Sequence, residues 1–202
     1  MSHDLLITRQ VDNTARKNIV RLNKKLIATA DLTEDIILPP ATIIEFCNQE
    51  EKLLIPLPKK HYSLFELRQK YNSYFFNKNK GWYYEHRFFR QEKLSAKYLV
   101  ITNGILSDSI GLSFKKVQEK LSNQDYLPLS AVEIMWCLIV YRRACGENLL
   151  PHHFSFTSSI SDTGNIVQIG FGLKQDENSI FYQKPERGRQ FLGILPKLNF
   201  KI

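Results

Sequence analysis

The segment from Ser130 to Gly146 constrains the fold more than any other part of the sequence. Ser130 and Glu133 have the spacing of a capping box, in which each side chain accepts a hydrogen bond from the other residue's backbone N–H. Gly146 stands where a helix commonly ends in a left-handed residue, so the pattern predicts a helix between these positions. Because the enclosed residues are apolar on nearly every side, we expect this helix to be buried at the centre of the fold.

The residues after Pro151 change to a two-residue alternation that is typical of strands. The predicted strands are four: His153 to Ser158, Ile166 to Leu173, Ser179 to Gln183 and Phe191 to Leu195. Short polar turns, Asp162 to Asn165 and Gln175 to Asn178, separate the first three. These turns predict an antiparallel meander.

The residues before Ser130 favour helices separated by short apolar runs. Three helices are predicted from their N-caps: one from Asn13 to Leu26, one from Ser63 to Tyr74, and one after Ser113 that carries Phe114, Val117 and Leu121. Short apolar runs indicate strands or buried extended segments at Ala41 to Cys47, Lys52 to Leu57 and Lys97 to Thr102. Pro39 and Pro40 predict an extended break after the first helix.

Helices that precede a block of strands indicate an α+β fold. We expect a helical N-terminal half with a central buried helix packed on a C-terminal antiparallel β-sheet. The length of 202 residues favours a single domain over residues 1–202. Within it, residues 1–38 are a candidate N-terminal helical arm and residues 81–196 are the best-defined α+β core.

The composition indicates a basic protein that is soluble and cytoplasmic. The longest strongly apolar run, Ile134 to Tyr141, is far shorter than the roughly 20 residues that cross a bilayer. The first residues lack the pattern of a secretory signal. Three widely spaced cysteines, without a CxxC pair, argue against a disulfide framework and favour free thiols.

Residues 81–196 resemble a group of uncharacterised small bacterial proteins that carry no assigned function. The resemblance rests on spacing, chiefly of Gly81-Trp82-Tyr83, Gly146-Glu147-Asn148-Leu149-Leu150-Pro151 and the strands that follow. Two polar landmarks differ, because Phe156-Thr157-Ser158 stands where that pattern has Arg-Thr-Ser and Pro185-Glu186-Arg187 where it has an acidic run. The resemblance implies one co-folded α+β unit and transfers no site residues.

The segment from Lys59 to Lys97, here called the basic aromatic segment, is the main functional candidate. It holds ten of the 28 lysines and arginines, three acidic residues and 11 of the 24 aromatic residues. Cations attract phosphates, and exposed rings stack on unpaired bases, so this composition suits single-stranded nucleic acid or an acidic protein surface. The candidate binding residues are Lys78, Lys80, Trp82, Tyr83, Arg87, Arg90 and Lys93. The alternative is that the rings form core and the cations only a solvated rim.

The predicted helix after Asn13 has an apolar stripe and a basic face. Such a helix can lie on an anionic membrane or dock in a partner's groove. The alternative is that its apolar stripe packs on its own domain.

Other side chains suggest chemistry less directly. Arg187 and Arg189 flank Gly188 in a predicted connection, where two guanidinium groups can grip a phosphate or carboxylate. The five histidines lack the spacing of a metal site, so we expect no metal, and no motif indicates a cofactor. No nucleophile motif is recognisable.

These observations leave three hypotheses open. The first is a non-enzymatic binding domain for nucleic acid or an acidic protein, which uses the basic aromatic segment. The second is an enzyme of unfamiliar type, acting on a phosphorylated or carboxylated substrate, in which His86, Glu147 or the Arg187 and Arg189 pair converge on a cleft. The third is a structural component of a larger assembly.

Overall fold

The helix predicted after Ser130 lies at the centre of the fold in the computed structural model, which describes residues 3–75, 81–171, 178–183 and 190–199. This helix, α6 (Ala131–Cys145), begins at the expected capping box: the Ser130 N–H donates to the Glu133 carboxylate over 2.8 Å, and the Glu133 N–H donates to Ser130 Oγ over 3.3 Å. Gly146 ends it with a φ of 76°. The prediction of a central buried helix is confirmed, since every residue from Ala131 to Val140 is buried.

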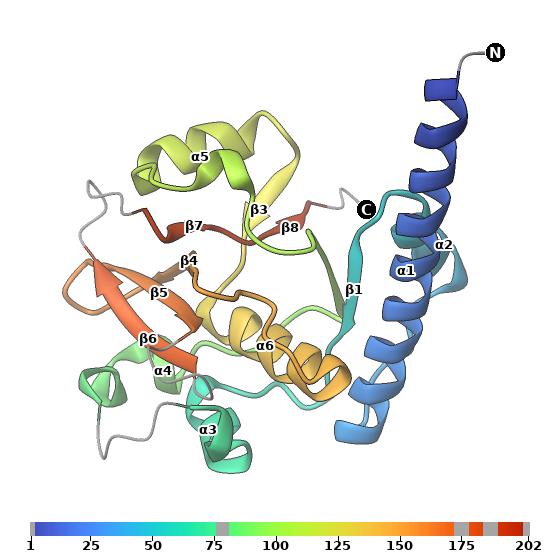
Figure 1. Ribbon diagram of the computed structural model, residues 1–202. Helices are drawn as coiled ribbons and strands as arrows, with labels where there is room; N and C mark the ends of the chain where they lie inside the picture. Colours follow the sequence, from blue (N-terminus) through green and yellow to red (C-terminus); the bar gives the residue numbers. More distant parts are fainter. Residues whose placement is uncertain (1–2, 76–80, 172–177, 184–189, 200–202) are drawn as a thin grey trace.

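Two four-stranded sheets lie on different sides of α6 (Figure 1). The first has the order β1-β2-β8-β3 and is antiparallel, with β1 (Leu53–Pro56), β2 (Tyr98–Ile101), β3 (Tyr126–Pro128) and β8 (Pro196–Leu198). The second has the order β6-β5-β4-β7, with β4 (Phe154–Ile160), β5 (Ile166–Phe171), β6 (Asn178–Gln183) and β7 (Leu192–Ile194). The α+β fold class is therefore as predicted.

The antiparallel meander of β4, β5 and β6 is confirmed, whereas β7 adds to β4 in parallel. The chain passes from the second sheet to the first at Leu195, between β7 and β8. Apolar residues of both sheets share one core with α6, and the indole N–H of Trp136 donates to the Pro56 carbonyl over 2.8 Å. The two sheets and α6 thus form a continuous core.

The remaining helices cover the outside of this core. They are α1 (His3–Thr33), α2 (Ala41–Gln49), α3 (Leu64–Lys70), α4 (Arg87–Arg90) and α5 (Phe114–Ser122), with 3-10 turns η1 (Asn72–Tyr74), η2 (Trp82–Glu85) and η3 (Ser107–Ser109). Among the described helices, none has both the length and the apolar character needed to cross a membrane.

Two predictions in the N-terminal half were wrong. The first helix begins at His3, ten residues before the predicted cap at Asn13. Ala41 to Cys47 is not extended but belongs to α2, which begins directly after Pro40. Proline fits the start of a helix, and Ile43 and Cys47 are four residues apart, so this short apolar run satisfied the helical period as well as the strand period.

The apolar stripe of α1 packs on its own core, as the second of the two interpretations of this helix expected. Ile19, Leu26 and Ala30 are buried, and α1 lies against β1, α2 and α6. Asn23 is also buried and fixes the contact: its Nδ2 donates to the Lys52 carbonyl, and its Oδ1 accepts the Leu54 N–H, each over 3.0 Å. The first turns of α1 extend past the other elements (Figure 1).

Candidate functional site

Most rings of the basic aromatic segment are part of the core. Tyr62, Tyr71, Phe75, Tyr83, Phe88 and Phe89 are buried. Phe65, Tyr74 and Tyr84 are half-buried against the same core. Trp82 is the most exposed described ring of the segment, at 36%. A stack of exposed rings for unpaired bases is therefore not present among the described residues.

Arg68 lies in the middle of this aromatic cluster rather than on its rim. It is 6% exposed, and its guanidinium carbon lies 4.9 Å from the centre of the Tyr84 ring and 5.7 Å from that of Tyr83. Its Nη1 donates to the Tyr83 hydroxyl. Burial raises the pKa of Tyr83, against the opposing effect of the guanidinium. Contacts of this kind between a cation and ring faces stabilise a buried charge.

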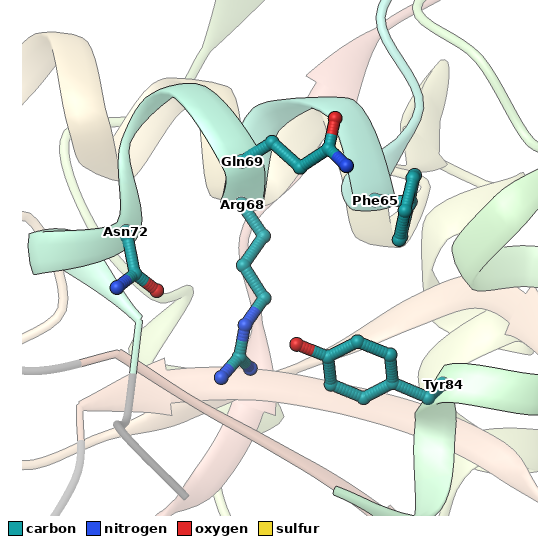
Figure 2. Close-up of a pocket in the computed structure, with 5 residues that line it drawn as sticks. All are labelled: Phe65, Arg68, Gln69, Asn72 and Tyr84. Carbon is teal, nitrogen blue, oxygen red and sulfur yellow. The ribbon is translucent and has the colours of Figure 1, made fainter. Parts of the chain in front are cut away.

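A small cavity of about 240 Å³ opens beside Arg68 (Figure 2). Phe65, Arg68 and Gln69 reach it from α3, Asn72 from η1 and Tyr84 from η2. Figure 2 shows the Tyr84 hydroxyl turned toward the guanidinium side of the cavity. The local sequence gave no signal for this cavity, because the residues that form it lie up to 19 positions apart.

The predicted binding cations of the same segment are exposed but largely engaged. Arg90 donates from Nε to the Tyr84 carbonyl over 2.7 Å, and its guanidinium lies over the Phe65 ring. Lys93 Nζ lies 3.8 Å from a carboxylate oxygen of Glu66. Because Arg90 and Lys93 already contact groups of the protein, less of their positive charge is available to a ligand.

Other predicted site residues are placed differently. Arg87 is exposed on α4, with Nε 3.4 Å from the Gln91 side-chain oxygen. Tyr83 is buried and presents no free ring face. Lys78, Lys80, Arg187 and Arg189 lie outside the described residues.

His86 and Glu147 do not converge. His86 Nδ1 accepts the backbone N–H of Asp162 over 3.1 Å, and the Asp162 carboxylate accepts the Arg87 N–H over 3.3 Å. The strand that leads to Asp162 ends beside the N-terminus of α6, where the Ala131 N–H donates to Ser159 Oγ. Glu147 follows the other end of α6, about 20 Å away for a helix of 15 residues.

Sequence reasoning missed a polar group at the same helix end. Ser159 Oγ accepts the Ala131 N–H over 2.8 Å and donates to the Glu92 carboxylate over 2.5 Å. Burial raises the pKa of Glu92, the nearby Glu133 adds to this effect, and the Ser159 hydrogen bond opposes it. Both residues line an open depression of about 560 Å³. Because 67 residues separate Glu92 from Ser159, no local pattern indicates their contact.

A further basic surface lies on α1. Five cations on the helix are exposed: Arg16, Lys17, Arg21, Lys24 and Lys25. None of them forms an ion pair within the part of the chain that the structure describes. From Thr14 to Ala30 the helix carries no acidic residue. We call these five residues the α1 basic face. At 3.6 residues per turn, Lys17, Arg21 and Lys24 lie opposite the buried stripe, and Arg16 and Lys25 lie on either side of them.

The comparisons with known proteins give no further guide. No family model, curated protein or solved structure matches the chain. The resemblance of residues 81–196 to uncharacterised bacterial proteins thus stays a prediction. Among the described residues, no three His, Cys, Asp or Glu side chains gather as a metal site.

Proposed function

We propose that the protein is a non-enzymatic domain that binds the sugar-phosphate backbone of nucleic acid. In this proposal the side chains of the α1 basic face make the main contact. The observation that carries this proposal is a set of five exposed cations on the outer side of α1, none of which forms an ion pair with a described residue. This proposal retains nucleic acid as the ligand of the first hypothesis, but the contact lies on α1 instead of on the basic aromatic segment.

The spacing on α1 suits a regular polyanion. At 3.6 residues per turn, Lys17, Arg21 and Lys24 fall within a sector of about 60°, and Arg16 and Lys25 flank it. The five span about 13 Å along the helix axis. Double-stranded DNA carries one negative charge per about 1.7 Å, so several cations of such a row can meet phosphates together. A helix also fits the major groove, which is about 12 Å wide.

The burial of the apolar and aromatic side chains favours a nucleic-acid duplex as the ligand over an anionic membrane or a single strand. A membrane-bound amphipathic helix inserts its apolar face, and here that face, with Ile19 and Leu26, is buried in the domain. Single-strand binders rely on exposed rings, whereas the described rings of the basic aromatic segment are mostly core. Phosphate contacts position a protein without reading bases, so we expect binding that depends little on sequence.

Charge reversal tests the proposal. The variant Lys17→Glu/Arg21→Glu/Lys24→Glu removes three contacts and adds repulsion, so we expect at least tenfold weaker binding of a fluorescein-labelled duplex by fluorescence anisotropy. The matched control, Lys115→Glu/Lys116→Glu, reverses two exposed lysines on α5 and should retain most of the affinity. A loss of binding free energy per reversed charge that is as large in the control as in the α1 variant would show that net charge alone matters and would contradict a site on α1.

Competition separates nucleic acid from an acidic protein. Poly-glutamate has a flexible backbone and a less regular array of charges, so we expect unlabelled duplex to displace the labelled duplex at much lower charge concentration. Displacement by poly-glutamate at equal or lower concentration would favour an acidic protein partner instead.

A further inference from the structure

The cavity beside Arg68 combines a buried positive charge with polar side chains at its rim. Its volume is about 240 Å³, and its described walls are Phe65, Arg68, Gln69, Asn72 and Tyr84. Gln69 and Asn72 are exposed, whereas Arg68 is only 6% exposed. No residue of the α1 basic face lines the cavity, so it is a separate site from the proposed nucleic-acid contact.

The Arg68 guanidinium is held in place by aromatic side chains. Its carbon lies 4.9 Å from the centre of the Tyr84 ring, 5.7 Å from that of Tyr83 and 5.9 Å from that of Phe75. Its Nη1 donates to the Tyr83 hydroxyl. Figure 2 shows the side chain extending from α3 toward Tyr84, whose hydroxyl is turned toward the guanidinium. A cation that is fixed before a ligand arrives loses little conformational freedom on binding.

The two aromatic walls of the cavity are fixed in a similar way. Phe65 from α3 and Tyr84 from η2 both contact the buried Phe89, with ring centroids 6.2 Å and 5.1 Å apart. Tyr84 also stacks on Tyr83, with the ring centroids 5.4 Å apart. The cavity therefore places a fixed charge beside apolar ring surface, an arrangement that suits a ligand with one anionic and one apolar end.

The described lining carries one positive charge and no negative one. Arg68 is its only charged residue, and Gln69, Asn72 and Tyr84 are uncharged residues that can donate hydrogen bonds. A guanidinium has five N–H donors in a planar fork, so it can hold the Tyr83 hydroxyl and also donate to a carboxylate. Because a single guanidinium balances a single negative charge, the lining favours a monoanion over a phosphate dianion.

We propose that this cavity binds a small monocarboxylate, with the carboxylate on the Arg68 guanidinium and the Tyr84 hydroxyl, and with its apolar part against the Phe65 ring. The size of the cavity supports this class of ligand. At about 30 Å³ for each molecule of liquid water, about 240 Å³ is the space of roughly eight waters. A carboxylate that carries one small ring, such as benzoate, is of this size. Sites for drug-sized ligands are larger, at roughly 300–1,000 Å³.

Titration with benzoate, followed by the NMR signals of the backbone amides of α3 and η2, tests the proposal. We expect saturable shifts that fit one site. Benzamide has nearly the same shape but no charge, so it should bind about tenfold more weakly, because it forms no ion pair with Arg68. Equal affinities for benzoate and benzamide would overturn the role of Arg68, and benzoate that causes no saturable shifts in α3 and η2 would overturn the site.

Variants at the rim test the site without altering a buried residue. Asn72→Asp and Gln69→Glu keep the size of exposed side chains and place a carboxylate at the cavity, so each should weaken benzoate binding about fivefold to twentyfold. The matched controls, Asn123→Asp and Gln118→Glu, make the same changes at exposed positions of α5 and its C-cap and should retain the affinity. Equal losses in the rim variants and their controls would contradict a site at this cavity.

Two further variants test the contact itself and its independence from α1. Arg68→Lys keeps the charge without the planar fork, so it should weaken benzoate binding about threefold to tenfold, with circular dichroism to check the fold. An unchanged affinity in this variant would contradict the bidentate contact. The variant Lys17→Glu/Arg21→Glu/Lys24→Glu should keep its affinity for benzoate at about 0.15 M salt, where the Debye length is about 8 Å, because none of these residues lines the cavity. A parallel loss of benzoate binding there would contradict the separation of the two sites.

Discussion

Glu92 shows how a single buried carboxyl group reports on its surroundings. It lies between the Ser159 hydroxyl and the nearby Glu133, which is paired with Lys197. Burial raises its pKa above the ordinary value of 4.5, so the ionised form is less stable in the folded protein than in the unfolded chain.

We predict that Glu92→Gln stabilises the protein at neutral pH. A group with a raised folded-state pKa contributes stability that is full below its unfolded pKa and is lost as the pH rises through the folded pKa. Glutamine still accepts from Ser159 and carries no charge, so the gain at pH 8 should be on the order of 1 kcal/mol. Urea unfolding at pH 4 and pH 8 measures it; a gain that is as large at pH 4 as at pH 8 would contradict the titration of Glu92 as its cause.

Glu34 has the opposite behaviour. Burial alone would raise its pKa, but hydrogen bonds from Lys70, Tyr71 and Tyr62 outweigh burial and hold the pKa below 4.5. The Tyr62 hydroxyl donates to it over 2.9 Å, and the Glu34 side chain is only 8% exposed. These contacts fasten the end of α1 to α3 and the residues around it.

Replacement of Glu34 by glutamine should therefore destabilise the protein at neutral pH, by about 2 kcal/mol, because it removes charged acceptors from three donors. A lowered folded-state pKa gives stability that is present above the unfolded pKa and is lost as the pH falls through the folded pKa. The cost measured by urea unfolding should thus shrink below about pH 4.5. Asp35→Asn, next in sequence but 77% exposed in its ion pair with Lys59, is the control and should change stability by less than about 0.5 kcal/mol.

At the scale of elements, α1 has two faces in different environments. Its inner face belongs to the core, with Leu26 and Ala30 completely buried. Its outer face carries the exposed cations. A helix arranged in this way presents charge to a ligand without any change in how it packs.

The inner face of α1 is tested by Leu26→Ala, which leaves a cavity and should lower the free energy of unfolding by about 3 kcal/mol. Leu32→Ala is the matched control on the same helix, since Leu32 is 87% exposed, and should change stability by less than about 0.5 kcal/mol. Similar small effects of both changes in chemical denaturation would mean that α1 is not docked on the domain in solution.

Local patterns predicted the elements whose signals lie within a few residues. The capping box at Ser130, the N-cap at Ser63 and the turn from Asp162 to Asn165 are of this kind, and each gives the expected start or connection. The other predicted turn, Gln175 to Asn178, lies largely outside the described residues. The prediction of an extended segment from Ala41 to Cys47 was wrong because a run of seven residues fits both the helical and the strand period. The contact that distinguishes them, between Cys47 of α2 and Leu54 and Val100 of the first sheet, is tertiary.

At the scale of the whole molecule, it could not be predicted from the sequence whether aromatic residues belong to the core or to a binding surface, because both contain the same residue types. Rings and cations in the basic aromatic segment suit a nucleic-acid surface, yet the fold uses the rings as core and places Arg68 among them. The cavity beside Arg68 and the depression beside Glu92 depend on residues that are distant in sequence. Tertiary packing alone brings them together.

The packing of the core leaves the outer side of α1 exposed, and this α1 basic face is central to the proposed function. Its positive charge is uncovered, and its geometry is fixed by the burial of the opposite face. Binding of these cations to the phosphate backbone of a duplex depends on the release of counterions from the phosphates.

The dependence of duplex affinity on salt concentration tests this account most directly. If the five cations of the α1 basic face meet about four or five phosphates, the slope of log K against log salt should be about −4, and about −1 to −2 for Lys17→Glu/Arg21→Glu/Lys24→Glu. A slope near zero, or one that is the same in the variant as in the unaltered protein, would contradict the central claim.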